Sequence, residues 1–436
     1  MTSNSQDDLA KEELIAKYIK KLIKNVESLQ LPHKQLQAFK SLVLMTKVRD
    51  DKLIGNLITL GGLPVILRCA KQKNDFEMQI EAICALTNMI TGCKDHLDGV
   101  MKAGAFPVLC HLLNSYCLQV CEQSVNAIAN VVVSGKIYCE QAIDKGIVRS
   151  LSYMYYLHPS SPIIIRRVAC ILRYICRVKL CYTLVKKIIP VIRALIYQVD
   201  KDIKLDILYA IVYLTDNIDF PFKLILEYGV LKHMISFLDD SDIKILTTAL
   251  HGIGNCLKDT KKLVESALDN NILQHLNILV IHNESLVRKS ALFCLGELLG
   301  NPISYVQDDI SAQLIVNIYI NLTDEDFDVN KETIYALMNL SATGSKDHIF
   351  TLANMEFIST ICDMLVYSDW EIIKMILKLI LNLIARSEEY FITITSLVRN
   401  HIDFTMLEYL MQHENTDIQK FAMEIYTDLN YESYIV

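Results

Sequence analysis

Asparagine side chains recur at matching places along this sequence. In EQSVNAIANVVVSG, Asn126 and Asn130 stand four residues apart, which puts both amides on one face of a helix. An amide donates and accepts hydrogen bonds, so these residues are suited to binding. A single asparagine on a helix is usually a plain exposed amide. A column of them at a fixed repeat spacing is what a peptide-binding groove needs.

No segment carries a recognisable catalytic or metal-binding motif. GIGNCLK (252–258) has two glycines at dinucleotide-loop spacing, but it lacks the third and lies in a helical pattern. CLQVC (117–121) has the wrong spacing for a zinc pair. SGK (134–136) lacks the upstream glycine of a phosphate loop. We therefore expect a protein that is not an enzyme and that has no cofactor and no metal site.

The amides belong to a column that repeats through most of the chain. Its members are Asn88, Asn130, Tyr174, Tyr213, Asn255, Glu297, Asn339 and Asn382. Their successive separations are 42, 44, 39, 42, 42, 42 and 43 residues. Self-similarity at about 40–47 residues is typical of solenoids built from stacked units of two or three helices.

A second motif recurs between the column segments. LITLGGLPVIL, VMKAGAFPVLCHLL, AIDKGIVRSLSYM and ILEYGVLKHMISFL each end one helix at a glycine and begin another. Pro64 and Pro107 fall early in the new helix, where a missing N–H costs little. Asn271 takes the glycine's place in LDNNILQHL. We expect one continuous all-α body.

The composition agrees with a helical protein of a reducing compartment. Of 436 residues, 52% are hydrophobic, only 14 are Gly and 8 are Pro, and the 13 Cys follow no signal-peptide pattern. No uninterrupted apolar run approaches about 18 residues, so we expect no membrane span. The formal net charge of −7 disfavours nucleic acid and suits basic partners.

The order of these units resembles the importin α family, armadillo-repeat adaptors that carry nuclear-localisation peptides to the import receptor. The resemblance runs from about Leu31 to Tyr431. Its most specific stretches are EAICALTNMITG, EQSVNAIAN, DILYAIVYLTD, TALHGIGN, KETIYALMN and LMQHENTDIQKFAMEIY. It implies a right-handed armadillo-repeat superhelical solenoid of about nine or ten repeats over residues 31–431.

Outside that domain we expect a disordered N-terminus (1–10), a capping helix (11–30) and a C-terminal tail (432–436). The stretch KEELIAKYIKKLIKNVESL has apolar residues at helical spacing. It holds five lysines but not the arginine-rich run with which importin α binds importin β. A shortened form of that binding element is the alternative interpretation.

In importin α, the third helix of each repeat presents a Trp and, four residues later, an Asn. The Trp rings attract Lys or Arg side chains of the signal, and the Asn side chains hydrogen-bond its backbone. The resemblance places Cys84, Asn126, Cys170, Tyr209, His251, Phe293, Tyr335 and Lys378 at the Trp position. The one Trp, Trp370, lies outside this column.

The resemblance implies a peptide-binding groove with two halves. The major-site half comprises Cys84, Asn88, Gly92, Glu122, Asn126, Asn130, Ser134, Asp206, Tyr209 and Tyr213. The minor-site half comprises His251, Asn255, Phe293, Glu297, Glu332, Tyr335 and Asn339. Ser134 replaces the acid that grips the central lysine of a signal, whereas Glu332, Tyr335 and Asn339 match the family. We expect the better-preserved groove over residues 206–340.

Two functions stay open. The first is an adaptor of the cytoplasm and nucleus that binds Lys/Arg-rich nuclear localisation signals of cargo proteins in a concave groove. Its partners would include an importin-β-type receptor and an export receptor at the C-terminal repeats. We expect it to bind neither nucleic acid nor membrane. The second is an armadillo scaffold that has lost classical signal binding and binds another protein partner.

Overall fold

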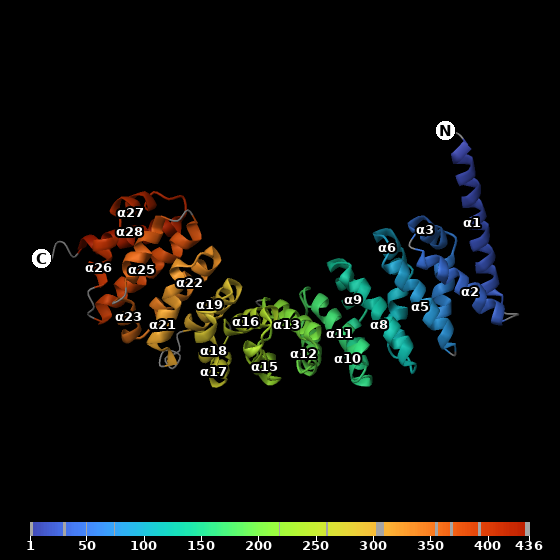
Figure 1. Cartoon of the computed structure of the whole chain (residues 1–436), viewed down its shortest axis with the longest axis horizontal. Coiled ribbons are helices and arrows are strands. Elements are labelled where there is room, and N and C mark those ends of the chain that lie inside the picture. The colour runs from blue at the N-terminus through green and yellow to red at the C-terminus, as the bar shows by residue number, and fades with distance from the viewer. Residues whose placement is uncertain are drawn as a thin grey trace. The chain divides into compact units, whose positions relative to one another are not determined.

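The computed structural model of the chain is built from helices (Figure 1). It describes residues 3–28, 32–48, 50–73, 75–217, 219–258, 260–301, 309–353, 356–366, 369–390 and 394–431, without the side chains of 3–11, 32, 33, 387–390 and 431. Within these ranges no strand occurs, which confirms the all-α fold class. The chain divides into two compact units, unit 1 (Met1–Asn217) and unit 2 (Ile218–Val436).

Unit 1 begins with two helices and continues in groups that each end in a longer helix. The first two are α1 (Ser3–Glu27) and α2 (Pro32–Lys47). Three groups of three follow: α3 (Asp51–Thr59), α4 (Gly62–Ala70) and α5 (Phe76–Ile90); α6 (Lys94–Lys102), α7 (Ala105–Leu112) and α8 (Leu118–Val133); α9 (Lys136–Asp144), α10 (Ile147–Leu157) and α11 (Pro162–Ile175). The last group has two helices, α12 (Tyr182–Leu195) and α13 (Lys201–Thr215).

Unit 2 repeats the pattern. Its first groups are α14 (Lys223–Glu227), α15 (Val230–Ser236), η1 (Phe237–Asp239) and α16 (Ile243–Leu257), then α17 (Lys261–Asp269), α18 (Ile272–Leu279) and α19 (Ser285–Leu299). Next come α21 (Ala312–Tyr319), η2 (Ile320–Thr323) and α22 (Phe327–Thr343). The last are α23 (Lys346–Ala353), α24 (Phe357–Asp363), η3 (Met364–Val366) and α25 (Trp370–Tyr390), then α26 (Ile394–His401), α27 (Phe404–Leu410) and α28 (Thr416–Tyr431).

The helix junctions follow the chemistry expected of the second motif. Gly61, Gly104, Gly146 and Gly229 have φ of 91°, 80°, 83° and 63°, and Asn271 has φ of 60°. Each ends one helix in the left-handed conformation that glycine, and next best asparagine, adopts at little cost. No glycine stands between Cys176 and Lys201. There α12 runs as a single helix of 14 residues, with Pro190 inside it.

The longer helices of consecutive groups pack side by side. In unit 1 the order of contact is α2, α5, α8, α11, α13, and in unit 2 it is α16, α19, α22, α25, α28. We call each row a ladder. The apolar stripe of each helix is fully covered by its neighbours, as for Leu86, Ile128 and Leu337 at 0% exposure. Stability of such a stack is close to a sum over neighbouring repeats.

The N-terminal helix α1 runs from Ser3 to Glu27 and so includes residues 3–10, for which we predicted disorder, as well as most of the predicted capping helix. It packs against α2 and α4, because Ile19, Leu22 and Val26 form a buried stripe. The expected tail at 432–436 lies outside the described residues.

Among the described residues, no single helix has both the length and the apolar composition needed to cross a membrane. Two bent pairs, α3 with α4 and α23 with α24 and η3, pass the same test together. In the first pair Leu57 and Ile66 are fully buried, and the core helices of a soluble protein meet this criterion as readily as membrane spans do.

Candidate peptide-binding faces

Each ladder presents one row of side chains that its neighbours do not fully cover. Cys84 and Asn88 of α5 are half-buried, whereas Ala85 and Leu86 beside them are completely buried. The same alternation holds for Phe293 and Glu297 of α19. Apart from Asn255, which is only 2% exposed, the column positions therefore lie on one side of each row, which we call the unit 1 ladder face and the unit 2 ladder face.

The amides of the unit 1 ladder face mostly have partners within the protein. The amide nitrogen of Asn88 donates to Thr46 Oγ1 at 3.0 Å, and Asn126 Oδ1 accepts from Arg167 Nε at 2.6 Å. The side chain of Asn130 makes no hydrogen bond to any described residue. Ser134 Oγ donates to the Asn130 carbonyl at 2.7 Å, so this hydroxyl caps α8. One amide of three is free to meet a ligand.

Arginines in α11 and just after it cover the acid and the tyrosines of this face. Arg173 Nη1 lies 3.0 Å from Asp206 Oδ1, and its guanidinium carbon lies 4.3 Å from the centre of the Tyr209 ring. Arg177 lies 5.7 Å from the centre of the Tyr213 ring. These are the contacts that lysines or arginines of a bound peptide would make, and the chain makes them itself.

Burial sets the protonation of the remaining groups here. It raises the pKa of Asp206, which the ion pair with Arg173 opposes, and it raises the pKa of the Cys84 and Cys170 thiols, which therefore stay neutral. Glu122 accepts a hydrogen bond of 2.8 Å from Ser161 Oγ. Arg167, Arg173 and Arg177 thus outnumber the two acids, Glu122 and Asp206, that the sequence singled out in this part of unit 1.

On the unit 2 ladder face, one lysine occupies the first group of column residues. Lys258 Nζ lies 4.9 Å from the centre of the Phe293 ring, 3.6 Å from Glu297 Oε1 and 3.5 Å from Asn255 Oδ1. The His251 ring packs 5.2 Å from that of Phe293. The Asn255 amide, the Phe293 ring and the Glu297 carboxylate therefore surround a cation, as expected of a groove that binds basic peptides. Here, however, the cation is Lys258 of the protein itself.

The next group along this face contains a half-buried carboxylate, that of Glu332, without a partner among the described residues. Tyr335 donates from its hydroxyl to Glu297 Oε1 at 3.2 Å, and Asn339 Nδ2 donates to the Gly296 carbonyl at 2.9 Å. Glu332 is half-buried and has no hydrogen bond or ion pair with the described residues. Burial raises the pKa of both Glu332 and Glu297. A buried carboxylate without a partner favours a cationic ligand.

The two lysines that act on Glu332 form ion pairs with other acids. Lys289 forms an ion pair with Asp328, and Lys331 forms one with Glu371. Both lower the pKa of Glu332 at longer range but do not offset its burial. The carboxylate is thus half-buried among two lysines and the acids Glu297 and Asp328, and it forms no ion pair with any described residue.

The aromatic rings of this face rest on glycines of the preceding helix. A Cβ atom added to Gly254 would lie 2.5 Å from the Phe293 ring, and one added to Gly296 would lie 2.6 Å from the Tyr335 ring. Both glycines stand three residues after a column position. Their absent side chains let each ring lie against the neighbouring helix of the ladder.

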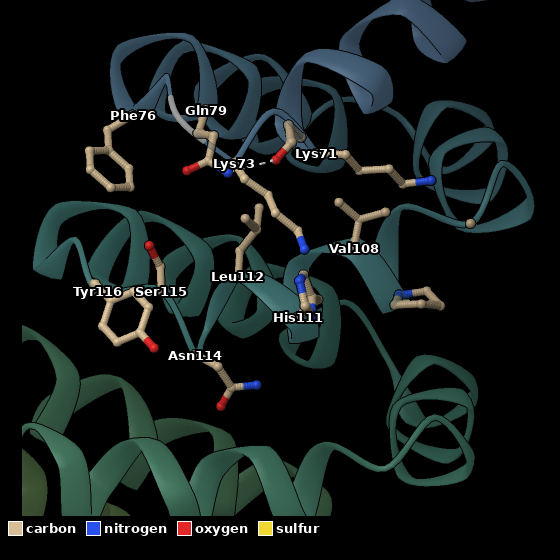
Figure 2. Close-up of a pocket in the computed structure, with 13 residues that line it drawn as sticks. Lys71, Lys73, Phe76, Gln79, Val108, His111, Leu112, Asn114, Ser115 and Tyr116 are labelled. Carbon is tan, nitrogen blue, oxygen red and sulfur yellow. Dashed lines mark hydrogen bonds between the residues drawn. The ribbon is translucent and has the colours of Figure 1, made fainter.

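A separate cavity of about 890 Å³ lies in unit 1, at the ends of α4 and α7 and the start of α5. Figure 2 shows Phe76 and Tyr116 at one side of it and Lys73 extending toward His111. None of its thirteen lining residues is an acid, so it lacks the carboxylate that orients histidine in a Ser–His–Asp arrangement. It contains none of the site residues expected from the sequence.

The helical groups, the glycine junctions and the two ladders define the class: an all-α armadillo solenoid. No protein-family model matches the chain. It is 24% identical over 401 residues to importin subunit alpha-1b of Oryza sativa subsp. japonica, covering 90% of this chain and 75% of that protein.

Two relatives from Arabidopsis thaliana agree. Importin subunit alpha-8 is 26% identical over 341 residues (78% of this chain, 75% of that protein), and importin subunit alpha-3 is 24% identical over 435 residues (97% and 82%). The crystal structure of an engineered protein matches with a TM-score of 0.79 at 20% identity, covering 95% of this chain and 99% of that one. The chain is a divergent, importin-α-like protein.

Proposed function

We propose that this protein is a nuclear-import adaptor that binds extended Lys/Arg-rich segments of cargo proteins on its unit 2 ladder face. The observation that carries the proposal is Glu332, a half-buried carboxylate without a partner among the described residues, next to Tyr335 and Asn339. A peptide lysine placed there gains an ion pair and an aromatic neighbour. The protein acts without catalysis and works in cytoplasm and nucleus.

The unit 1 ladder face contributes less to this binding. Among the described residues, Arg167 and Arg177 carry positive charge without an acid at ion-pair distance, and Asp206 is already paired with Arg173. A lysine of the peptide would have to displace Arg173 and approach two further guanidinium groups. The major and minor halves of the family's groove therefore differ in their share of binding, with the C-terminal half dominant.

Fluorescence anisotropy with a labelled Lys/Arg signal peptide, and a Lys→Ala peptide as control, tests the proposal. Glu332→Gln keeps the shape of the side chain and removes its charge, so affinity should fall about tenfold, or about 1.4 kcal/mol. Glu265→Gln makes the same change on α17, where Glu265 pairs with Lys261, and should leave binding unchanged. Equal affinity for both peptides would contradict signal binding.

The alternative function is an armadillo scaffold, and three arginines in or just after α11 favour it. A face with Arg167, Arg173 and Arg177 attracts a segment rich in Asp and Glu. The same anisotropy assay with an acidic peptide separates the two functions. Tight binding of the acidic peptide, lost in Arg167→Gln, together with no binding of the basic one, would replace the adaptor by the scaffold. As an adaptor, the protein's further partners are an importin-β-type receptor and an export receptor.

A further inference from the structure

Three side chains with metal-binding atoms meet between α3 and α6 in unit 1. They are Asp51 in the first turn of α3, Cys93 at the N-cap of α6, and His96 in the first turn of α6. Their ligand atoms all lie within 4.8 Å of one another. The two helices are in contact and are the first helices of two consecutive repeats.

The histidine is buried and lacks a hydrogen-bond partner at its inner nitrogen. His96 is 5% exposed, and its Nδ1 has no hydrogen bond to the described residues. Asp51 Oδ1 is 3.6 Å away, too long for a hydrogen bond. Buried polar atoms are nearly always satisfied, and this imidazole nitrogen is left without a partner among the described residues, so it can accept a metal ion.

Two glycines fit around the imidazole ring. A Cβ on Gly92 would lie 2.9 Å from His96 Nδ1, and one on Gly55 would lie 3.8 Å from His96 Nε2. Gly92 leaves room for Nδ1 beside the turn that carries Cys93. Gly92, which is also a predicted residue of the peptide groove, lies against this histidine.

The donor set and its dimensions suit zinc. A tetrahedral zinc ion with bonds of about 2.0–2.3 Å holds its ligand atoms roughly 3.4–3.6 Å apart. The His96–Asp51 separation of 3.6 Å already fits, and the Cys93 thiol, within 4.8 Å of both ligand atoms, completes the set by moving closer. Thiolate, imidazole and carboxylate together select a metal of borderline softness.

We propose that Asp51, Cys93 and His96 bind one Zn²⁺ ion, which braces α3 against α6. The Cys93 thiol gives up its proton to solvent when the ion binds. The Asp51 side chain is 67% exposed, so the fourth position faces water and holds a water molecule. The brace is independent of the peptide site, which uses other helices.

The sequence alone does not reveal this site, because its three ligands come from two different repeats. Cys93 and His96 form a C-x-x-H pair, and Asp51 precedes Cys93 by 42 residues, one repeat period. Neither piece is a zinc motif by itself. Only the contact of α3 with α6 brings the third ligand to the other two.

Titration of the full-length untagged chain with Co²⁺ tests the site, because a thiolate bound to cobalt gives a charge-transfer absorption that carboxylate and imidazole do not. We expect one equivalent of Co²⁺, displaced by Zn²⁺, and a rise in melting temperature with Zn²⁺. Cys93→Ser should abolish the thiolate band and weaken Zn²⁺ binding at least tenfold. Serine is a better N-cap than cysteine, so this variant keeps α6 folded.

Cys181→Ser is the matched control. Cys181 is the exposed thiol of unit 1, and a hydrogen bond with the Thr183 hydroxyl lowers its pKa, so it is the favoured place for adventitious metal. The band should survive in Cys181→Ser and weaken in Asp51→Asn. A band that persists in Cys93→Ser, or no stoichiometric Co²⁺ binding by the parent chain, would overturn the proposal.

Discussion

On both ladder faces, cationic side chains of the protein make the contacts that lysines or arginines of a bound peptide would make. Lys258 approaches Phe293, Glu297 and Asn255 in unit 2, and Arg173 approaches Tyr209 and Asp206 in unit 1. A cation above an aromatic ring is worth about 0.5–2 kcal/mol depending on exposure. A peptide must displace these cations before it gains the same contacts. The sequence supplies the residue types, but only the fold decides that they satisfy one another.

Lys258→Ala should therefore strengthen binding of a basic peptide. The substitution uncovers the Phe293 ring and leaves the half-buried carboxylate of Glu297 without its cation, so a lysine of the peptide replaces Lys258. We expect a several-fold lower Kd, or roughly 1 kcal/mol, given that the Lys258 side chain is 46% exposed. The control is Lys261→Ala in α17, which makes the same change of net charge away from Phe293 and Glu297 and removes only an exposed ion pair with Glu265. Equal gains in both variants would show a general charge effect.

The raised pKa of Glu332 predicts how peptide binding depends on pH. The carboxyl must be ionised to hold a lysine, so affinity is full above its raised pKa and is lost as pH falls through it. This loss begins at higher pH than for an exposed glutamate, which titrates near about 4.3. Glu332→Gln should flatten the profile measured by anisotropy between neutral pH and pH 5. An unchanged profile would place the pH dependence on another group.

The raised pKa of Glu332 affects the free energy of unfolding in the opposite direction to its effect on peptide binding. The folded state of a carboxyl whose pKa is raised holds its proton more tightly than the unfolded state does. Its contribution to the free energy of unfolding is greatest at low pH and falls as pH rises from the unfolded pKa to the folded one. A bound cation removes that cost, so a basic peptide should stabilise unit 2 more at neutral pH than at acidic pH.

At the scale of elements, glycines of the third helices determine how closely the unit 2 ladder packs. Gly254→Ala adds a methyl group 2.5 Å from the Phe293 ring, which forces the ring from its place between α16 and α19. We expect a loss of about 1–3 kcal/mol in the free energy of unfolding, although alanine favours a helix by up to about 1 kcal/mol.

Gly99→Ala in α6 is the control for that substitution. Its added Cβ would lie 3.8 Å from Ile58, an ordinary contact, so helix propensity should make it neutral or slightly stabilising. Urea denaturation of both variants gives the comparison. Similar behaviour of the two would mean that the Phe293 ring has room to move.

The sequence predicts the elements better than it predicts the site. A period near 42 residues and the glycine junctions identify the repeats, and Gly61, Gly104 and Asn271 have the backbone conformation expected of them. Side-chain partners between helices could not be inferred, because they depend on rotamers and on the exact offset between ladder helices. Arg167 meets Asn126 across 41 residues, and no local pattern selects that pair over others.

At the scale of the whole molecule, the division into two compact units predicts that a destabilising substitution in one unit leaves the other unit folded. Ile128 lies at 0% exposure in α8, which packs between α5 and α11. Ile128→Ala leaves a cavity that costs about 2–5 kcal/mol. Because a solenoid is stabilised mainly by contacts between neighbouring repeats, amide hydrogen exchange should increase in α5, α8 and α11, while α19 and α22 of unit 2 keep their protection.

Peptide binding provides a second readout of the same variant. If the unit 2 ladder face carries the signal site, Ile128→Ala should bind a basic peptide with unchanged affinity even as unit 1 loosens. Ile334→Ala, an equally buried change in α22, should do the reverse and weaken binding because α22 carries Glu332, Tyr335 and Asn339. Faster exchange throughout both units in either variant would mean that the chain unfolds as one cooperative block, and the local character of the proposed site would then have to be tested by Glu332→Gln alone.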